Sequence, residues 1–299
     1  MVAMRIVSLL PSATEIVYAL NLGEDLVGVT HECDWPPEAR GKRLVSHSAL
    51  PAGASPAEVD RLVSQSLEGG NPIYRLDHEA IRELRPDIVI TQDLCAVCAV
   101  PSGHVHEALD LLGCPAQVVS LDPSSLDEVL DCVLQVGTVS GTLPEAQAFV
   151  GQLRRRLELV KQSVAGLQRP RTFALEWGDP PFNGGHWVPE MIEAAGGESL
   201  LGSHGTPSVR ITWEAIAAVA PEVVVFMPCG YNLDGAIEEG KTLKKRPELA
   251  EVQQFFAADA SAFFSRPGPR LIDGVELLAA ALHPGAIGSY PLGGIARLP

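Results

Sequence analysis

The pair Cys95-Ala96-Val97-Cys98 has the spacing of a redox couple or of half a zinc site. No second Cys-x-x-Cys occurs, and the nearby His104 and His106 are two residues apart, which fits no common zinc spacing. Two interpretations stay open. The two thiols either perform redox or metal chemistry, or they line a cleft or pack in the interior.

A second cluster of potential ligands is His31-Glu32-Cys33-Asp34, which follows an apolar, β-branched run. Imidazole, thiolate and carboxylate groups all bind metals. However, consecutive residues of an extended segment cannot all point at one centre, because side chains alternate along it. Metal contact, lining of a ligand cleft and plain loop structure therefore all remain possible for His31 and its neighbours.

The third segment, residues 176–187, gathers Trp177, Phe182, His186 and Trp187 among Gly and Pro residues. These Gly and Pro residues oppose regular structure, so a loop is expected to present the rings. Further loops that follow predicted strands contribute Tyr231, Phe264 and Arg266. Aromatic groups and an Arg at the strand ends predict a cleft for a large, partly flat ligand.

These loops must be positioned by an alternation of short apolar runs and longer helical patterns, which predicts an α/β fold with mainly parallel strands. The clearest strands are expected at residues 5–10, 26–30, 87–91 and 117–121, and again at 172–176, 223–227 and 262–265. The sequence Ser12-Ala13-Thr14-Glu15 predicts a capping box at the start of the first helix.

The longest helix is predicted from residue 142 to about residue 168, where apolar residues recur at steps of three and four behind a second capping box. An internal repeat lies on either side of it. Residues 79–90 match residues 214–225, and both segments read as Glu, a short helix, Pro, an acid and a β-branched strand. We therefore expect an N-terminal lobe at 1–141, a connecting helix at 142–168 and a C-terminal lobe at 169–299. The alternative is one more crossover helix within a single sheet.

Composition narrows the classes of function. The chain has 299 residues, enough for two domains, and a formal net charge of −15, which argues against a reader of nucleic acid or anionic membrane. Neither a span of 18 apolar residues nor an export leader is evident, and the six cysteines slightly favour a reducing compartment. The motifs GxxxxGK[ST], GxGxxG, HExxH and GxSxG are all absent, so we expect no enzyme.

Four motifs in order along the chain resemble the cobalamin-binding substrate-binding proteins of ABC importers. They are Leu10-Pro11-Ser12-Ala13-Thr14-Glu15, Asp34-Trp35-Pro36-Pro37 after Gly28-Val29-Thr30, Arg85-Pro86-Asp87, and Pro180-Pro181-Phe182. The resemblance covers about residues 5–280 and extends to the wider class that binds cobalamin, siderophores and haem. It implies two Rossmann-like lobes joined by one long α-helix, with little closure of the lobes.

The resemblance also implies that a Glu on each lobe docks on arginines of the permease, and these positions match Glu79 and Glu214. The plain alternative is that a Glu in the first turn of a helix is favoured by the helix dipole. Departures from the family pattern are Gln92 at a position that is often Trp, Ala262 at an acidic position, and the Cys95/Cys98 pair. Tyr74 is expected to replace another aromatic of the cleft.

We therefore predict a non-enzymatic, monomeric binding protein that captures a corrinoid between its lobes and delivers it to an ABC permease dimer through both lobes. It has no cofactor of its own, because the corrinoid is the transported ligand. Alternatives are a siderophore or haem carrier, or a cytoplasmic metal- or thiol-dependent protein that uses Cys95 and Cys98. The family implies a periplasmic or cell-surface location, whereas a gene that starts at this residue would place the protein in the cytoplasm. The expected ligand-binding residues are Pro11, His31, Tyr74, Gln92, Cys95, Trp177, Phe182, His186, Trp187, Tyr231, Phe264 and Arg266, and no metal site is expected.

Overall fold

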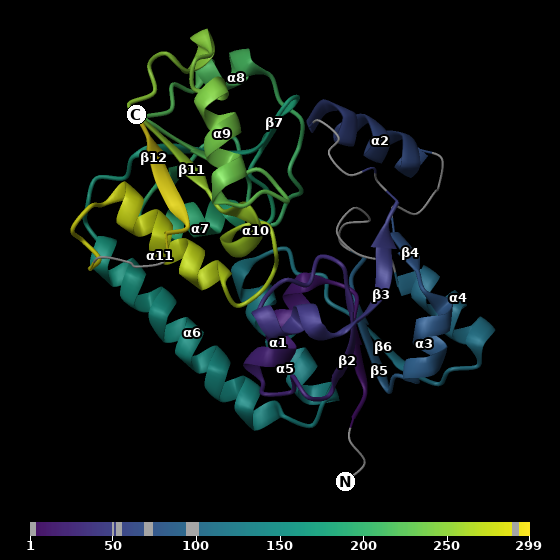
Figure 1. Cartoon of the computed structure of the whole chain (residues 1–299). Coiled ribbons are helices and arrows are strands. Elements are labelled where there is room, and N and C mark those ends of the chain that lie inside the picture. The colour runs from purple at the N-terminus through teal and green to yellow at the C-terminus, as the bar shows by residue number, and fades with distance from the viewer. Residues whose placement is uncertain (1–3, 50, 52–55, 69–73, 94–101, 289–292) are drawn as a thin grey trace. The chain divides into compact units, whose positions relative to one another are not determined.

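A computed structural model describes residues 4–49, 51, 56–68, 74–93, 102–288 and 293–299. The chain divides into two compact units. Unit 1 comprises Met1–Pro123 and Asp131–Phe149, and unit 2 comprises Ser124–Leu130 and Val150–Pro299. Each unit is built on its own six-stranded sheet (Figure 1).

The sheet of unit 1 has the strand order β4-β3-β2-β1-β5-β6. All neighbours are parallel except β3 and β4. The strands are β1 Ile6–Ser8, β2 Leu26–Thr30, β3 Arg43–Ser48, β4 Tyr74–Leu76, β5 Ile88–Thr91 and β6 Gln117–Ser120. Parallel strands end at one edge of a sheet, so the loops that follow β1, β2 and β5 share that edge.

Helices cover this sheet because its central strands β1 and β5 are buried along their whole length. Ile81 of α3 and Val105 of α4 join Val7 and Val89 of the sheet in one buried cluster. The helices with residues in unit 1 are α1 Pro11–Ala19, α2 Pro56–Glu68, α3 His78–Leu84, α4 Ser102–Leu112, α5 Leu126–Val139 and the first part of α6 Leu143–Val164, with the short 3-10 helix η1 Pro37–Gly41. The first turn of α5 belongs to unit 2.

The sheet of unit 2 has the order β12-β11-β10-β7-β8, with β9 paired to β7. Strands β7, β9, β10 and β11 are parallel, whereas β8 and β12 are antiparallel edge strands. The strands are β7 Arg171–Gly178, β8 Pro181–Asn183, β9 Glu198–Ser199, β10 Val223–Phe226, β11 Gln254–Ala258 and β12 Ile295–Leu298. The helices are α7 Val188–Ala194, α8 Trp213–Ala218, α9 Leu233–Leu243, α10 Ala260–Phe263 and α11 Leu271–Leu282, with the 3-10 helix η2 Pro247–Leu249.

The long helix α6 runs from Leu143 to Val164, and Figure 1 shows it as one unbroken helix. Its first part, to Phe149, belongs to unit 1 and the remainder belongs to unit 2. Arg156 anchors the second part, because its Nε donates to Glu276 Oε1 at 2.9 Å and its Nη2 donates to Glu276 Oε2 at 2.6 Å and to Asp273. Both acids lie on α11. These hydrogen bonds raise the pKa of Arg156 above its ordinary value, although burial opposes them.

The predicted fold class, two α/β lobes with mainly parallel sheets and one long helix, is confirmed. One predicted strand, at residues 262–265, is wrong. The strand there is β11, which ends at Ala258, and the carboxylate of Asp259 then accepts the backbone N–H of Ala262 at 2.9 Å and starts α10. An Asp that caps a helix ends the strand before the apolar run ends.

The predicted capping box at Ser12 and Glu15 is also wrong. A helix capped by Ser12 would begin at Ala13, but helix α1 begins two residues earlier, at Pro11, and its N-cap Leu10 makes no side-chain cap. Ser12 and Glu15 are instead buried inside the first turns. Pro11 starts the helix because its fixed φ suits the first helical position, where no N–H is needed.

The internal repeat corresponds to matched structures in the two units. Glu79 and Glu214 are each the second residue of a short helix, α3 and α8, and both are exposed. The caps also match, because Asp77 accepts the N–H of Ala80 at 2.9 Å and Thr212 accepts that of Ala215 at 3.2 Å. Each helix is followed by a left-handed residue and a Pro before an interior strand.

Candidate functional site

The carboxyl ends of the strands in unit 1 carry a buried layer of hydroxyl groups. Ser8, Thr30 and Thr91 are the last residues of β1, β2 and β5, and all three are buried. The Ser46 hydroxyl donates to Thr30 Oγ1 at 2.8 Å, and Thr30 Oγ1 lies 3.3 Å from His31 Nδ1. Thr30 therefore connects this layer to His31, because a hydroxyl can both donate and accept.

His31, Glu32 and Tyr74 are brought together above this layer. The rings of His31 and Tyr74 are 5.9 Å apart, and the Tyr74 hydroxyl donates to Glu32 Oε1 at 3.5 Å. Tyr74 belongs here because β4 runs antiparallel to β3, so its first residue lies where β3 ends. Tyr74 is 7% exposed, whereas His31 is exposed. This group presents an imidazole, a phenol and a carboxylate.

Gln92 directly follows β5 and is 3% exposed, and its Oε1 has no hydrogen-bond partner among the residues that the structure describes. An unpaired buried amide oxygen costs about 1–3 kcal/mol.

Pro11 is buried at the start of α1. Cys95 and Cys98 lie outside the described residues, but the two ends of their segment are joined, because Asp93 accepts the Ser102 N–H at 2.7 Å.

Asp93 is a strong acceptor at this edge. Partial burial raises its pKa, but hydrogen bonds from Ser102 and Ser120 outweigh this effect and leave the pKa below its ordinary value. The backbone N–H of Asp93 in turn donates to Asp122 at 2.5 Å. Two carboxylates and two hydroxyls therefore connect the ends of β5 and β6.

In unit 2, the end of β7 carries an aromatic wall, defined as Trp177 and Tyr231. Their rings meet edge to face at 6.0 Å and 85°. Phe182 of β8 pairs with Trp177 across the strands, and the Arg210 guanidinium lies 5.6 Å from the Phe182 ring. Phe182, Trp177 and Tyr231 are all half-buried. They present apolar edges at the strand ends.

The neighbouring loop is braced by Glu176. Its Oε1 accepts the Gly185 N–H at 3.2 Å, and its Oε2 accepts the Ser208 hydroxyl. The loop then passes through His186, whose φ of 51° is left-handed. Burial lowers the pKa of His186, so the folded protein favours the neutral imidazole.

Trp187 and Phe264 lie in the interior of unit 2. They are 5% and 1% exposed, and the Trp187 indole N–H donates to the Phe264 carbonyl at 2.8 Å. They position the loops around them. Arg266, two residues after Phe264, is half-buried. The role of each of these residues in ligand binding stays a prediction.

Two residues at these edges were not selected from the sequence. Trp35 is 47% exposed and lies in the loop after β2, where a strand-end aromatic within the motif Asp34-Trp35-Pro36-Pro37 was the available signal. Glu239 of α9 reaches the end of β7, and nothing in the local sequence distinguishes it from Glu238.

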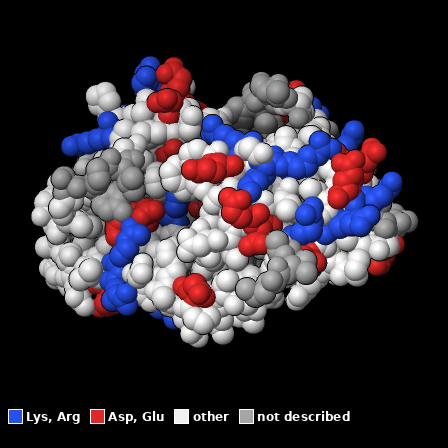
Figure 2. Space-filling view, turned by 60° about the horizontal axis from the view of Figure 1, so that its bottom comes forward, with Lys and Arg blue, Asp and Glu red and all other residues white. Residues whose placement is uncertain are grey.

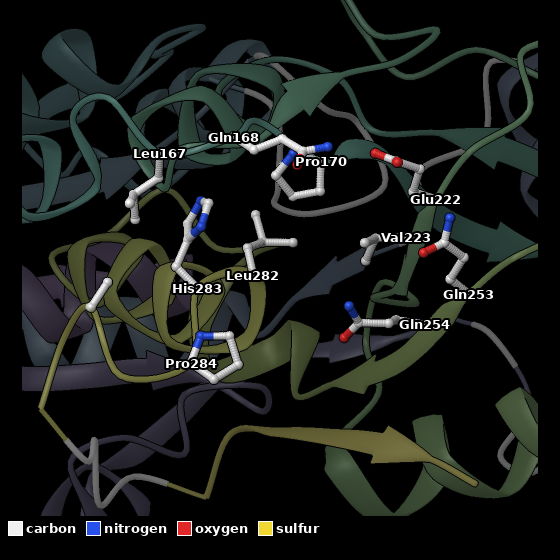
Figure 3. Close-up of a pocket in the computed structure, with 11 residues that line it drawn as sticks. Leu167, Gln168, Pro170, Glu222, Val223, Gln253, Gln254, Leu282, His283 and Pro284 are labelled. Atoms are coloured by element: carbon white, nitrogen blue, oxygen red, sulfur yellow. The ribbon is translucent and has the colours of Figure 1, made fainter.

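A pocket of about 560 Å³ lies at the opposite edge of the unit 2 sheet, where β7, β10 and β11 begin (Figure 3). Figure 3 shows the side chains of Gln168, Glu222 and Gln254 around an apolar floor that includes Leu282. None of the predicted ligand-binding residues that the structure describes lines it. This pocket is separate from the strand-end loops.

Residues 6–259 match the family model described as periplasmic binding protein. The chain belongs to the periplasmic binding protein family. Among curated relatives of this periplasmic binding protein is the vitamin B12-binding protein of Vibrio cholerae, 26% identical over 94% of this chain and 89% of the relative. Another is an ABC transporter substrate-binding lipoprotein of Bacillus subtilis, 25% identical over 94% of this chain and 80% of the relative.

Solved structures with the same fold include two with different named ligands. A periplasmic haem-binding protein of Pseudomonas aeruginosa superposes on this periplasmic binding protein with a TM-score of 0.71 and 23% identity, over 98% and 97% of the two chains. The periplasmic vitamin B12-binding protein of Vibrio cholerae gives 0.65 and 24%, over 94% and 96%. At these identities the likeness shows the fold, and the ligand must be argued from the residues.

The lowered pKa of His186 predicts a pH dependence of stability. As the pH falls below about 6.5, the unfolded chain takes up the proton first, so the free energy of unfolding should fall until the folded protein is also protonated. His186→Asn removes this group and tolerates the left-handed backbone. We expect the variant to lose less stability than the natural protein between pH 7.5 and pH 5, measured by urea unfolding. An equal loss in both proteins would show that His186 is not the group responsible.

Proposed function

We propose that this periplasmic binding protein captures a corrinoid, cobalamin or a close relative, for delivery to an ABC importer. The family supplies the class, a substrate-binding protein of the importer type, and its members are transport proteins rather than enzymes. The relative that is named for vitamin B12 matches almost the whole chain. The corrinoid is cargo and not a resident cofactor.

The observation that carries the choice of ligand is the charge of the segments that follow the strands along the sequence. Residues 9–14, 31–36, 49–55, 92–101 and 121–125 contain no Lys or Arg, but they contain Glu32, Asp34, Asp93 and Asp122. In unit 2, residues 177–187 and 227–232 also lack Lys and Arg, whereas Arg266 and Arg270 lie in the loop after β11 and the Arg210 guanidinium lies against the Phe182 ring. The Arg270 guanidinium lies 5.8 Å from the Phe263 ring.

This local charge favours a neutral ligand. A corrinoid carries uncharged amides around its rim, whereas haem carries two propionates and ferric siderophore complexes are commonly anionic. A carboxylate placed among acids is repelled, and an amide N–H is a good partner for them. The net charge of −15 does not decide between a neutral and a charged ligand, because basic and acidic side chains are intermixed on the face shown in Figure 2.

The aromatic groups would supply most of the binding energy. Tyr74, Phe182 and the aromatic wall would pack on apolar edges of the corrin, and Gln92 and Arg266 would bond its amides. Burial of a large ligand at about 25 cal/mol/Å² can sustain sub-micromolar affinity after the cost of association.

A haem carrier is the second candidate, and one observation favours it. His31 and Tyr74 lie 5.9 Å apart, and imidazole and phenolate are both axial ligands of haem iron. The experiment is a parallel titration with cyanocobalamin, haemin and a ferric siderophore, followed by visible absorbance. We expect cyanocobalamin to bind most tightly. Preference for haemin, with loss of haemin binding in Tyr74→Phe, would establish the second candidate instead.

We further propose that Glu79 and Glu214 dock on basic residues of the permease, because both are exposed at the same position of matched capped helices. A Glu79→Ala/Glu214→Ala double variant is expected to bind cyanocobalamin as before and to bind the permease at least tenfold more weakly, measured with permease in nanodiscs. Glu83→Ala/Glu238→Ala changes the same number of exposed acids and is the control. Permease affinity that is equal in the two variants would reject the docking role.

We place the working protein in the periplasm or at the cell surface, and we propose that it acts as a monomer. No helix of the described residues combines the length and apolar character needed to cross a bilayer.

A further inference from the structure

Glu239 of α9 packs against the backbone at the end of β7. A Cβ atom added at Gly178 would lie 2.7 Å from Glu239 Oε1 and 2.8 Å from Leu243 Cδ1. Gly178 is the last residue of β7, directly after Trp177. The Glu239 carboxyl group therefore lies at the strand end beside the aromatic wall.

The surroundings of this carboxyl group are acidic. Burial raises its pKa, the neighbouring charge of Asp179 raises it further, and the Tyr231 hydroxyl opposes both. Burial and the Glu239 charge in turn raise the pKa of Tyr231 to about 12. Within the described part of the chain, no Lys, Arg or His forms an ion pair with Glu239, while the adjacent Glu238 pairs with Lys241 at 3.2 Å.

A carboxylate in such surroundings lowers the stability of the fold. A half-buried carboxylate without a cation is less favourable than a neutral side chain of the same shape. Acids whose pKa is raised in this way are concentrated at functional sites. The Tyr231 hydroxyl bonds to Glu239, and its ring contacts Trp177. Its backbone carbonyl accepts the Ser261 N–H at 3.1 Å, so Tyr231 lies where the loops after β7, β10 and β11 meet.

We propose that Glu239 is a specificity-determining residue whose negative charge beside Tyr231 and Trp177 favours ligands that offer N–H donors and rejects ligands that offer carboxylates. This inference rests on the proposed function, since it concerns the same binding face. It adds a residue and a selection rule that the family likeness does not supply.

The test uses Glu239→Gln, which keeps the shape and removes the charge. The matched ligands are cyanocobalamin and its monocarboxylic acids, in which one rim amide is hydrolysed. We expect the natural protein to prefer the amide over at least one acid isomer by about fivefold, the effect of two like unit charges about 4 Å apart in a water-like dielectric. This preference should fall to about one in Glu239→Gln. It should remain in Glu238→Gln, the control on the same helix.

A stability measurement separates this role from a structural one. Because the Glu239 pKa is raised, Glu239→Gln should be at least as stable as the natural protein at pH 7.5 in urea unfolding. An unchanged ligand preference, or a variant that is clearly less stable, overturns the proposal.

Failure of the proposed function gives a different result. If the natural protein binds haemin and no corrinoid, the corrinoid assignment fails, and the Glu239 proposal is then tested with haemin. Its two carboxylates predict tighter binding to Glu239→Gln than to the natural protein. Equal haemin affinity, or no binding of either ligand class, overturns the proposal for Glu239 as well.

Discussion

Replacement of Gly185 by Ala is expected to lower the free energy of unfolding of unit 2 by about 2–3 kcal/mol, because the added methyl group overpacks a closed backbone contact. A Cβ atom at this position would lie 2.2 Å from the Ser208 backbone N and 2.6 Å from the Pro207 carbonyl carbon. These are backbone atoms, so no rotamer change relieves the clash. The segment around Ser208 must move, and this movement separates the two groups that Glu176 holds together.

The same substitution should weaken corrinoid binding, since the displaced loop carries His186 and precedes Trp187. Urea unfolding and thermal melting measure the first effect, with a Tm lower by about 5–10 °C. Gly151→Ala is the control, because Gly151 lies within α6 and its nearest neighbour would be Arg155 Nη1 at 3.5 Å. This control should be stabilised by about 0.5–1 kcal/mol. A Gly185→Ala protein as stable as the natural one would contradict the described packing.

Arg156→Met is the second substitution with a large expected effect, a loss of about 2–3 kcal/mol in the free energy of unfolding. The guanidinium is the shared partner of Glu276, which is 8% exposed, and of Asp273. Without it, two partly buried carboxylates on α11 lose the guanidinium that they share. The loss is smaller than for a fully buried pair, because Arg156 keeps some contact with water.

Two controls test this explanation. Arg154→Met removes a charge from the same helix, but its pair with Asp127 is exposed and 3.8 Å long, so its effect should stay below about 0.5 kcal/mol. Adding Asp273→Asn and Glu276→Gln to Arg156→Met should restore most of the stability, since no buried charge is then left alone. Equal losses for Arg154→Met and Arg156→Met would show that the network does not hold α6 to α11.

The regular parts of the fold could be predicted because their signals are local. The strands at residues 26–30 and 223–227 are bounded by polar loops, and the structure places β2 and β10 there to within one residue. The repeat around Glu79 and Glu214 could be read because cap, helix, Pro and strand recur together.

The errors arose where several signals compete. Residues 262–265 are apolar enough for a strand, but Asp259 starts a helix before them. Strands β3 and β4 were not predicted, because their segment is rich in turn-forming residues and β4 has only three residues. Such short strands are determined by their neighbours in the sheet and not by their own sequence.

The candidate site was predictable as a set of strand-end loops, but not as a set of contacts. His31 and Tyr74 are 43 positions apart along the chain and meet because β3 and β4 pair antiparallel. Trp187 was expected to present its ring, yet it is buried and bonded to the Phe264 carbonyl. Glu239 could not be identified from the sequence. Its carboxyl group lies at the end of β7 only because Gly178 has no side chain to occupy that space.

We propose that this periplasmic binding protein binds a neutral corrinoid at its strand-end loops. The most direct measurement is a calorimetric titration of the full chain with cyanocobalamin at pH 7.5. We predict one site per chain and a Kd below about 1 μM, consistent with burial of a large apolar ligand surface. No heat with cyanocobalamin or its relatives, together with tight binding of haemin or a ferric siderophore, would contradict the claim.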